Sequence, residues 1–312
     1  MKLISLSSPH IRDKITTGRI MGDVIIALLP ALAAGVWQFG WMALWLAAVC
    51  AAAAVGAEWL WCALSNRPLT INDGSALVTG VLLAMTLPPS APLWLAGLGG
   101  AAAVVLPKLF CGGLGQNPFN PALTARALLV LLFPLQMVRY ETADAVTSAT
   151  PLHEMAIGGL PQQSVWSLFV GSCPGSAGEI SALAILLGGA YLVWRRVISL
   201  RIPLAYLGTV AVLTLLFPRA GTAVEWMLCQ LLSGGLMLAA FFMATDYSSS
   251  PVTPNGRLLY GVGCGALTVL FRYVGIFPEG VTYAVLLMNA AAWTIDRYTA
   301  PRRFGVQKGG RT

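Results

Sequence analysis

Residues 42–64 read MALWLAAVCAAAAVGAEWLWCAL, an apolar run that contains one charged residue, Glu58. A helix needs about 20 consecutive apolar residues to cross the hydrocarbon core of a bilayer, and this run is long enough. Over its 312 residues the chain is 57% hydrophobic and only 10% charged, with a mean hydropathy of +0.75. A single soluble core could not bury that much apolar surface. The sequence therefore predicts an all-α polytopic membrane protein.

Nine further apolar segments accompany this run. The ten helices that we expect cover residues 20–38, 42–64, 75–88, 92–110, 121–138, 179–194, 202–218, 224–244, 258–273 and 280–296. Each segment should be helical, because irregular backbone cannot face lipid. Residues 1–19 are polar and basic and lack the apolar run of a cleavable signal peptide. We therefore expect the amino terminus to be retained.

The distribution of basic residues predicts the orientation. If the amino terminus is cytoplasmic, 15 of the 19 lysines and arginines lie on the inner side, three (Arg139, Arg219 and Arg272) lie outside and Arg126 lies inside a helix. Cytoplasmic loops carry the excess of Lys and Arg in membrane proteins. Both termini are therefore expected in the cytoplasm and the loop 139–178 outside it. The basic residues that give the net charge of +7 are scattered between apolar segments, so no nucleic-acid partner is predicted. Membrane lipid is the partner that we expect around the helices.

The ten segments also indicate an internal duplication into two halves of five helices each. Because five is an odd number, the two halves would have opposite orientations in the membrane. Segment 75–88 is short and ends in prolines, while segment 224–244 is interrupted by Gly234 and Gly235. Broken segments at matching places are typical of inverted repeats, whose ligand site forms near the midplane. We expect a first five-helix repeat, an extracytoplasmic loop, and a second five-helix repeat with a cytoplasmic tail, at residues 1–138, 139–178 and 179–312.

The long loop contains a polar run at residues 144–150, Asp-Ala-Val-Thr-Ser-Ala-Thr. A loop rich in Ser and Thr is most often only a solvated connection. This run, however, resembles the flavinylation motif, in which a dedicated flavin transferase esterifies the last Thr to the phosphate of FMN. The resemblance implies a covalent FMN on Thr150. The residues that the transferase would recognise are Asp144, Thr147, Ser148 and Ala149.

A second distinctive stretch, residues 111–122, reads Cys-Gly-Gly-Leu-Gly-Gln-Asn-Pro-Phe-Asn-Pro-Ala. By itself it is compatible with a simple turn and helix start. Together with Asp-Gly-Ser-Ala-Leu-Val-Thr-Gly at 73–80, Ser-Pro-His at 8–10 and the flavinylation loop, it resembles the D subunits of Rnf electron-transport complexes. Those proteins are related to the B subunit of the sodium-pumping NADH:quinone reductase. The resemblance covers essentially the whole chain.

Rnf complexes couple electron transfer between ferredoxin and NAD to translocation of sodium ions or protons. The resemblance implies a flavin-carrying subunit in a bacterial cytoplasmic membrane, not catalytic on its own, with the A, B, C, E and G subunits of the Rnf complex as partners. It also implies a non-covalent riboflavin near the inner Asn-Pro turn, for which Asn117 and Asn120 are the candidates by position. Their amides could equally cap backbone groups. Arg126 could hold a flavin oxygen or pair with an acid.

Three acidic residues at or near the ends of apolar segments are candidates for an ion pathway: Asp23, Glu58 and Asp246. Ionisable groups within a membrane are costly and are functional candidates by default. A structural role is an equal alternative, since all three fall near the predicted inner interface. The six cysteines form no C-x-x-C pair and there are only two histidines, so neither a metal site nor a bis-histidine haem is expected.

Two classes of function therefore remain. The first is an electron-carrying subunit of an ion-translocating oxidoreductase. The second is a solute channel or transporter without redox function, since inverted repeats with broken helices also build those proteins. A flavin acceptor on the outer face distinguishes the two classes, because a transporter has no need of one.

Overall fold

The computed structural model describes residues 16–66, 71–109, 115–138, 150–274 and 279–301. Within these residues all regular structure is helical. The helices are α1 (Thr17–Phe39), α2 (Trp41–Leu64), α3 (Ser75–Thr86), α4 (Leu93–Val104), α5 (Pro121–Leu132), α6 (Pro134–Met137), α7 (Pro151–Ala156), α8 (Val165–Val170), α9 (Ala182–Trp194), α10 (Arg201–Leu216), α11 (Ala223–Leu232), α12 (Leu236–Leu238), α13 (Pro254–Val274) and α14 (Val281–Thr299). Shorter turns are the 3-10 helix η1 (Ile71–Asp73) and the π-helices η2 (Val105–Leu109) and η3 (Ala239–Met243).

The apolar segments of the sequence coincide with these helices. Helices α1 and α2 are each long and apolar enough to cross a membrane, and α11 with Leu236–Met243 would form a third span that is bent by 65°. Several shorter apolar helices, among them α3, α5, α9 and α10, accompany them. The prediction of an all-α membrane protein is therefore confirmed.

The interruption expected near Gly234 is present. Helix α11 ends at Leu232, and Gly234 has a φ of +69°, a left-handed conformation that glycine adopts without strain. The chain then continues as α12 and η3. The break leaves backbone carbonyls without partners inside their own helix, and these can serve other side chains.

Residues 171–181, which connect α8 to α9, enter the bundle and are called the inserted segment below. The sequence did not predict this insertion. The N–H of Ala177 donates to the carbonyl of Leu87 at 3.1 Å, and the N–H of Gly178 donates to the carbonyl of Met85 at 2.9 Å. These bonds join the inserted segment to the end of α3. Two short helices that we did not expect, α7 and α8, precede it. The end of the long loop is thus part of the buried structure.

Glycines allow the same close packing in both halves of the chain. In the first half, Gly80 of α3 and Gly100 of α4 lie against the backbone at Cys50 of α2, where a Cβ atom would overlap. In the second half, Gly261 and Gly265 of α13 lie against α10, where an added Cβ atom would come within 2.9 Å of a backbone oxygen. Small residues let helices approach closely inside a bilayer, where no hydrophobic force draws them together.

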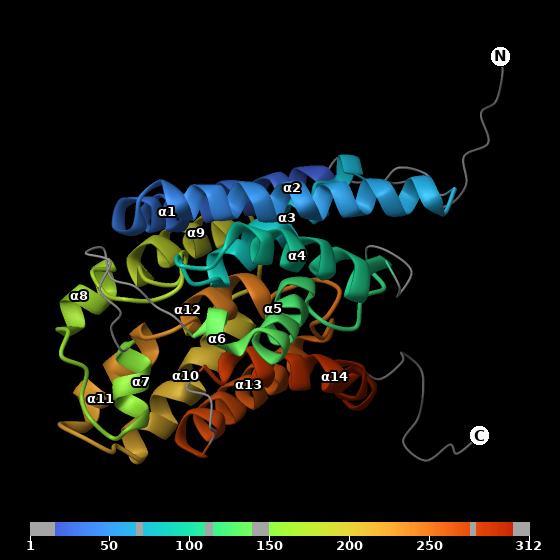
Figure 1. The fold of residues 1–312 in the computed structure, drawn as a ribbon. Helices are drawn as coiled ribbons and strands as arrows, with labels where there is room; N and C mark the ends of the chain where they lie inside the picture. Colours follow the sequence, from blue (N-terminus) through green and yellow to red (C-terminus); the bar gives the residue numbers. More distant parts are fainter. Residues whose placement is uncertain (1–15, 67–70, 110–114, 139–149, 275–278, 302–312) are drawn as a thin grey trace, which may run out of the picture.

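The two halves meet where α1 packs against α9 and where α5 packs against α14. Figure 1 shows α1 to α4 along one side of the molecule and α10, α13 and α14 along the other, with α5 between them. At the α1–α9 contact, Gly188 lies directly against the carbonyl of Ala27. The buried core runs without interruption through both halves.

We predict that Gly188→Ala lowers the thermal stability of the purified protein in detergent. The added methyl group would overlap the Ala27 carbonyl oxygen, and overpacking of a core costs about 1–3 kcal/mol. The control is Gly208→Ala in α10, where a Cβ atom meets nothing within 4 Å and alanine favours the helix. Equal melting temperatures for the two variants would contradict the close α1–α9 contact.

Candidate functional site

Thr150 begins α7 and caps it. Its Oγ1 atom accepts a hydrogen bond from the N–H of His153 at 3.3 Å, and Pro151 occupies the first helical position. The side chain is half-buried and lines a small cavity of about 20 Å³. The hydroxyl therefore lies at a fixed point where the long loop joins the folded body.

The other residues of the predicted attachment motif are Asp144, Thr147, Ser148 and Ala149, and they lie outside the described residues.

The Arg126 side chain forms ion pairs with two acidic side chains. Its Nη1 atom lies 2.6 Å from Oε1 of Glu179, and its Nη2 atom pairs with Oε2 of Glu279. Arg126 and Glu179 are both buried, whereas the Glu279 side chain is 29% exposed. Of the two roles considered for Arg126, pairing with an acid is thus the observed one.

Sequence reasoning did not identify Glu179 or Glu279 as site residues. Glu179 lies in the segment that enters the bundle, and Glu279 lies directly before α14. The signal that could have found them was Arg126 itself, because an arginine inside an apolar helix pairs with an acid or with backbone carbonyls.

A second arginine is buried close by. Arg272, which the charge count placed outside the membrane, is 5% exposed in the last turn of α13. It donates to the carbonyl oxygens of Gln230 and Ser233, at 2.5 and 3.0 Å, and to Oε1 of Gln230 at 3.0 Å. These carbonyls lie at the end of α11, so Arg272 caps the break in the helix. Arg272 is therefore a buried residue, and two of the three basic residues predicted on the outer side remain.

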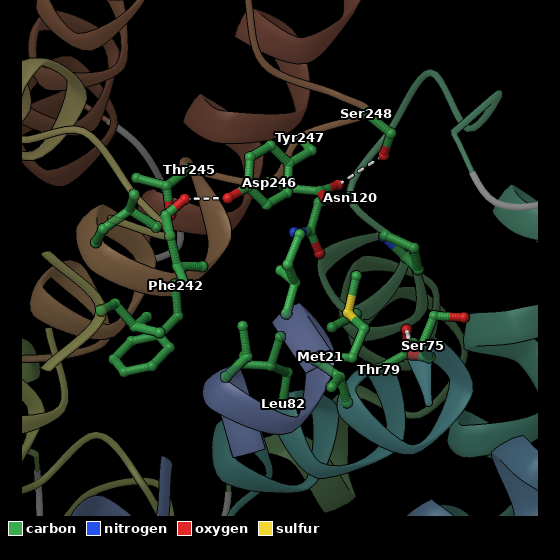
Figure 2. Close-up of a pocket in the computed structure, with 18 of the residues that line it drawn as sticks. Met21, Ser75, Thr79, Leu82, Asn120, Phe242, Thr245, Asp246, Tyr247 and Ser248 are labelled. Carbon is green, nitrogen blue, oxygen red and sulfur yellow. Dashed lines mark hydrogen bonds between the residues drawn. The ribbon is translucent and has the colours of Figure 1, made fainter. Parts of the chain in front are cut away.

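The Asn-Pro turn lines a separate cavity, shown in Figure 2. This cavity measures about 80 Å³ and adjoins a wider one of about 650 Å³, with which it shares Met21, Asp246 and Tyr247. Small-molecule sites are typically clefts of about 300–1,000 Å³. The wall consists of apolar side chains with several hydroxyls and amides, at Ser75, Thr79, Asn117, Asn120, Thr245 and Ser248.

The two asparagines differ in their hydrogen bonding. Asn120 caps α5: its Oδ1 accepts from the N–H of Leu123 at 3.2 Å and its Nδ2 donates to the carbonyl of Met243 at 3.1 Å. Asn117 donates to the carbonyl of Phe119, and its buried Oδ1 has no hydrogen-bond partner among the described residues. A buried polar atom without a partner is costly, so Asn117 offers an acceptor to a molecule in the cavity.

Asp246 also lines this cavity, in the loop that follows η3. Its Oδ2 accepts hydrogen bonds from Ser248 at 3.0 Å and from Ser249 at 2.9 Å. Burial raises the pKa of Asp246 above its ordinary value, while these two hydrogen bonds act in the opposite direction. Of the three candidate ion-pathway acids, Asp246 is the one that faces a described cavity.

The other two acids lie elsewhere. Asp23 pairs with Arg195, with 3.1 Å between Oδ2 and Nη2, and accepts a hydrogen bond from the Tyr191 hydroxyl at 3.0 Å. These contacts join α1 to α9 and favour the structural alternative for Asp23. Glu58 is fully buried in α2 and lines neither cavity.

Comparison with known proteins identifies relatives along the full chain. The model of the NQR2, RnfD, RnfE family matches residues 4–305. The chain is 46% identical to the D subunit of the Na(+)-translocating ferredoxin:NAD(+) oxidoreductase complex of Acetobacterium woodii, over 99% of this chain and 97% of that protein. It is 40% identical to the proton-translocating counterpart of Clostridium ljungdahlii, over 97% and 96%. It is 41% identical to the D subunit of the ion-translocating oxidoreductase complex of Stutzerimonas stutzeri, over 94% and 93%.

We predict that Arg126→Met destabilises the protein strongly, because it leaves Glu179 buried without its ion-pair partner. Removal of one partner of a buried ion pair costs about 3–5 kcal/mol. Thermal unfolding in detergent measures the loss. Arg195→Met is the control, because its ion pair with Asp23 is more exposed and should contribute far less. Adding Glu179→Gln to Arg126→Met should recover part of the stability. Similar losses in both single variants would contradict a central role for Arg126.

Proposed function

The chain belongs to the NQR2, RnfD, RnfE family, and from that membership we propose that it works as the D subunit of an Rnf-type electron-transport complex. Its relatives are named as subunits of ferredoxin:NAD(+) oxidoreductases that translocate sodium ions or protons. The protein is thus a membrane subunit of an ion-translocating oxidoreductase. In this proposal its partners are the A, B, C, E and G subunits, and the NAD and ferredoxin sites lie on soluble subunits among them. The names of these relatives favour this function over a solute channel or transporter.

We further propose that Thr150 carries FMN through a phosphoester bond to Oγ1. The hydroxyl of Thr150 is half-buried at the edge of the loop, beside a cavity, and is fixed by its position at the start of α7. A flavin bound there supplies one-electron redox chemistry, and the protein contributes its position and electrostatic surroundings. The sequence 144–150 and the position of Thr150 together support this proposal.

We propose that a second, non-covalent flavin such as riboflavin binds at the Asn-Pro turn, where the cavity of about 80 Å³ adjoins the wider one of about 650 Å³. Asn117 would accept a hydrogen bond from the flavin through its unpartnered Oδ1. Asn120, which caps α5, would hold the wall in shape rather than bind directly. Apolar contacts from Leu82 and Phe242, which Figure 2 shows below and beside the turn, would cover an aromatic ring.

The two sites lie at opposite ends of one helical run. Gly234 lines the cavity at Thr150, and Thr245 lines the cavity at Asn117. Thr245 follows Gly234 by eleven positions, and Leu236–Met243 between them is helical as α12 and η3. Two carriers spaced in this way would divide a hydrocarbon core of about 30 Å. In this proposal the termini are cytoplasmic and Thr150 faces the outer side.

The proposed architecture is a pair of inverted five-helix repeats. Helix α2 packs on α3 and α4 as α10 packs on α11 and α13. The glycine contacts described above occur in both sets, which supports the repeat.

We predict that Thr150→Val abolishes covalent flavin in protein produced together with a flavin transferase. Flavin fluorescence of the denatured protein on a gel is the measurement, and a mass adduct of FMN on the peptide 144–154 identifies the acceptor. Thr222→Val is a matched control, because Thr222 caps α11 as Thr150 caps α7, accepting from the N–H of Glu225 at 3.2 Å. Fluorescence that persists in Thr150→Val would show that another residue is the acceptor.

We predict that Asn117→Ala weakens retention of the non-covalent flavin. Loss of one hydrogen bond of about 1 kcal/mol corresponds to roughly fivefold weaker binding. The measurement is the amount of flavin released when the purified protein is denatured, titrated against added riboflavin. Asn255→Ala, an exposed position at the start of α13, should behave as the unaltered protein. Equal riboflavin affinity in both variants would refute the role of Asn117.

A further inference from the structure

Four charged side chains from parts of the chain far apart in sequence form a cluster, and its two acids line the cavity at Thr150. Arg126 comes from α5, Arg272 from α13, Glu179 from the inserted segment and Glu279 from the turn before α14. Arg126 forms ion pairs with both acids, and Arg272 interacts electrostatically with both. The charges of the cluster balance when both acids are ionised.

The small cavity at Thr150 connects this cluster to the proposed flavin position. Its lining includes Thr150, Glu179, Glu279 and Ser233. The volume of about 20 Å³ is enough for one water molecule, which requires about 10–15 Å³. The hydroxyl of Ser233 is buried there without a hydrogen-bond partner among the described residues, so the cavity has an unfilled polar contact.

The cluster also reaches the surface of the protein at Glu279. The Glu279 side chain is 29% exposed, whereas that of Glu179 is 4% exposed, and Arg126 bridges the two. A proton from water can therefore reach Glu279 first, and the water-sized cavity that both acids line provides a path to Glu179. The other titratable groups that face the cluster are Cys173, Tyr206, Tyr273 and Tyr283.

We propose that Glu279 and Glu179 form a redox-linked proton site: the pair takes up one proton from the outer side when one electron is added to the flavin on Thr150. This inference rests on the proposed function. The electron comes from a redox partner in the complex, and an O–H bond forms on a carboxylate oxygen of the pair. One negative and one positive charge arrive together, so the local net charge is unchanged, and reoxidation releases the proton outward.

The physical reason is the cost of adding charge where water is scarce. An added electron repels two nearby carboxylates across a medium of low effective dielectric constant, and protonation of one carboxylate removes that repulsion. A metal cation fits less well, because Arg126 already occupies an oxygen of each acid. A proton adds to a carboxylate without displacing Arg126.

The test uses the full-length chain carrying its covalent flavin, first verified by fluorescence on a denaturing gel. The one-electron midpoint potential is measured against pH by spectroelectrochemistry, and the spectrum of Thr150→Val is subtracted to remove any other flavin. Uptake of one proton per electron corresponds to a tenfold change per pH unit, or about 59 mV. We expect Glu279→Gln and Glu179→Gln each to flatten the pH dependence by up to this amount.

Glu154→Gln is the matched control. Glu154 lies on α7 only four residues from Thr150 and is half-buried, but it does not line the cavity at Thr150, and its carboxylate accepts a hydrogen bond from the N–H of Gln162. Its removal should leave the pH dependence unchanged, because Glu154 forms no ion pair with the cluster. Two isosteric variants at different depths are used so that one remains informative if the other fails to fold.

Infrared difference spectra of the unaltered protein give a readout that needs no variant. Reduction should produce a carboxylic acid C=O band that shifts in D₂O. Absence of this band, or equal pH dependence in Glu279→Gln, Glu179→Gln and Glu154→Gln, would overturn the inference while the covalent flavin on the gel still supports the proposed function. Absence of covalent flavin from the unaltered protein would overturn both.

Discussion

The structure depends on the neutralisation of Arg126 inside an apolar bundle. A guanidinium in α5 is too costly to leave unpaired within a membrane, and its partners come from two distant parts of the chain. Glu179 lies 53 residues away and Glu279 lies 153 residues away. Each ion pair therefore draws a non-helical segment against α5. This requirement joins the first half of the protein, the end of the long loop and the start of α14.

The inserted segment with Glu179 can enter the bundle only because its backbone is satisfied there. Ala177 and Gly178 donate to carbonyls at the end of α3, and Gly178 lies where a side chain would overlap Met85. Irregular backbone is tolerated at membrane depth only when it is enclosed by protein. The insertion also brings Glu179 to the cavity beside Thr150. The electrostatic requirement of Arg126 thus determines the surroundings of the proposed flavin.

The sequence predicted the features that arise from local chemistry. Hydropathy placed the helices, and Gly234 with Gly235 predicted the break after α11. The sequence did not predict the inserted segment, because its position follows from long-range pairs that have no periodic signal. The sequence also could not distinguish the two asparagines, because both have the amide that a flavin needs. In the folded chain Asn120 caps α5, whereas the Oδ1 atom of Asn117 has no hydrogen-bond partner among the described residues.

The break at Gly234 links the two proposed cofactor sites. The carbonyl of Ser233, freed by the break, accepts a hydrogen bond from Arg272, and Gly234 lines the cavity at Thr150. The helical run that resumes after the break carries Phe242 and leads to Thr245, which both line the cavity at the Asn-Pro turn. The helical residues Leu236–Met243 therefore set the distance between the two proposed cofactor sites. Since electron transfer depends steeply on distance, such a rigid spacer holds that distance better than side chains alone.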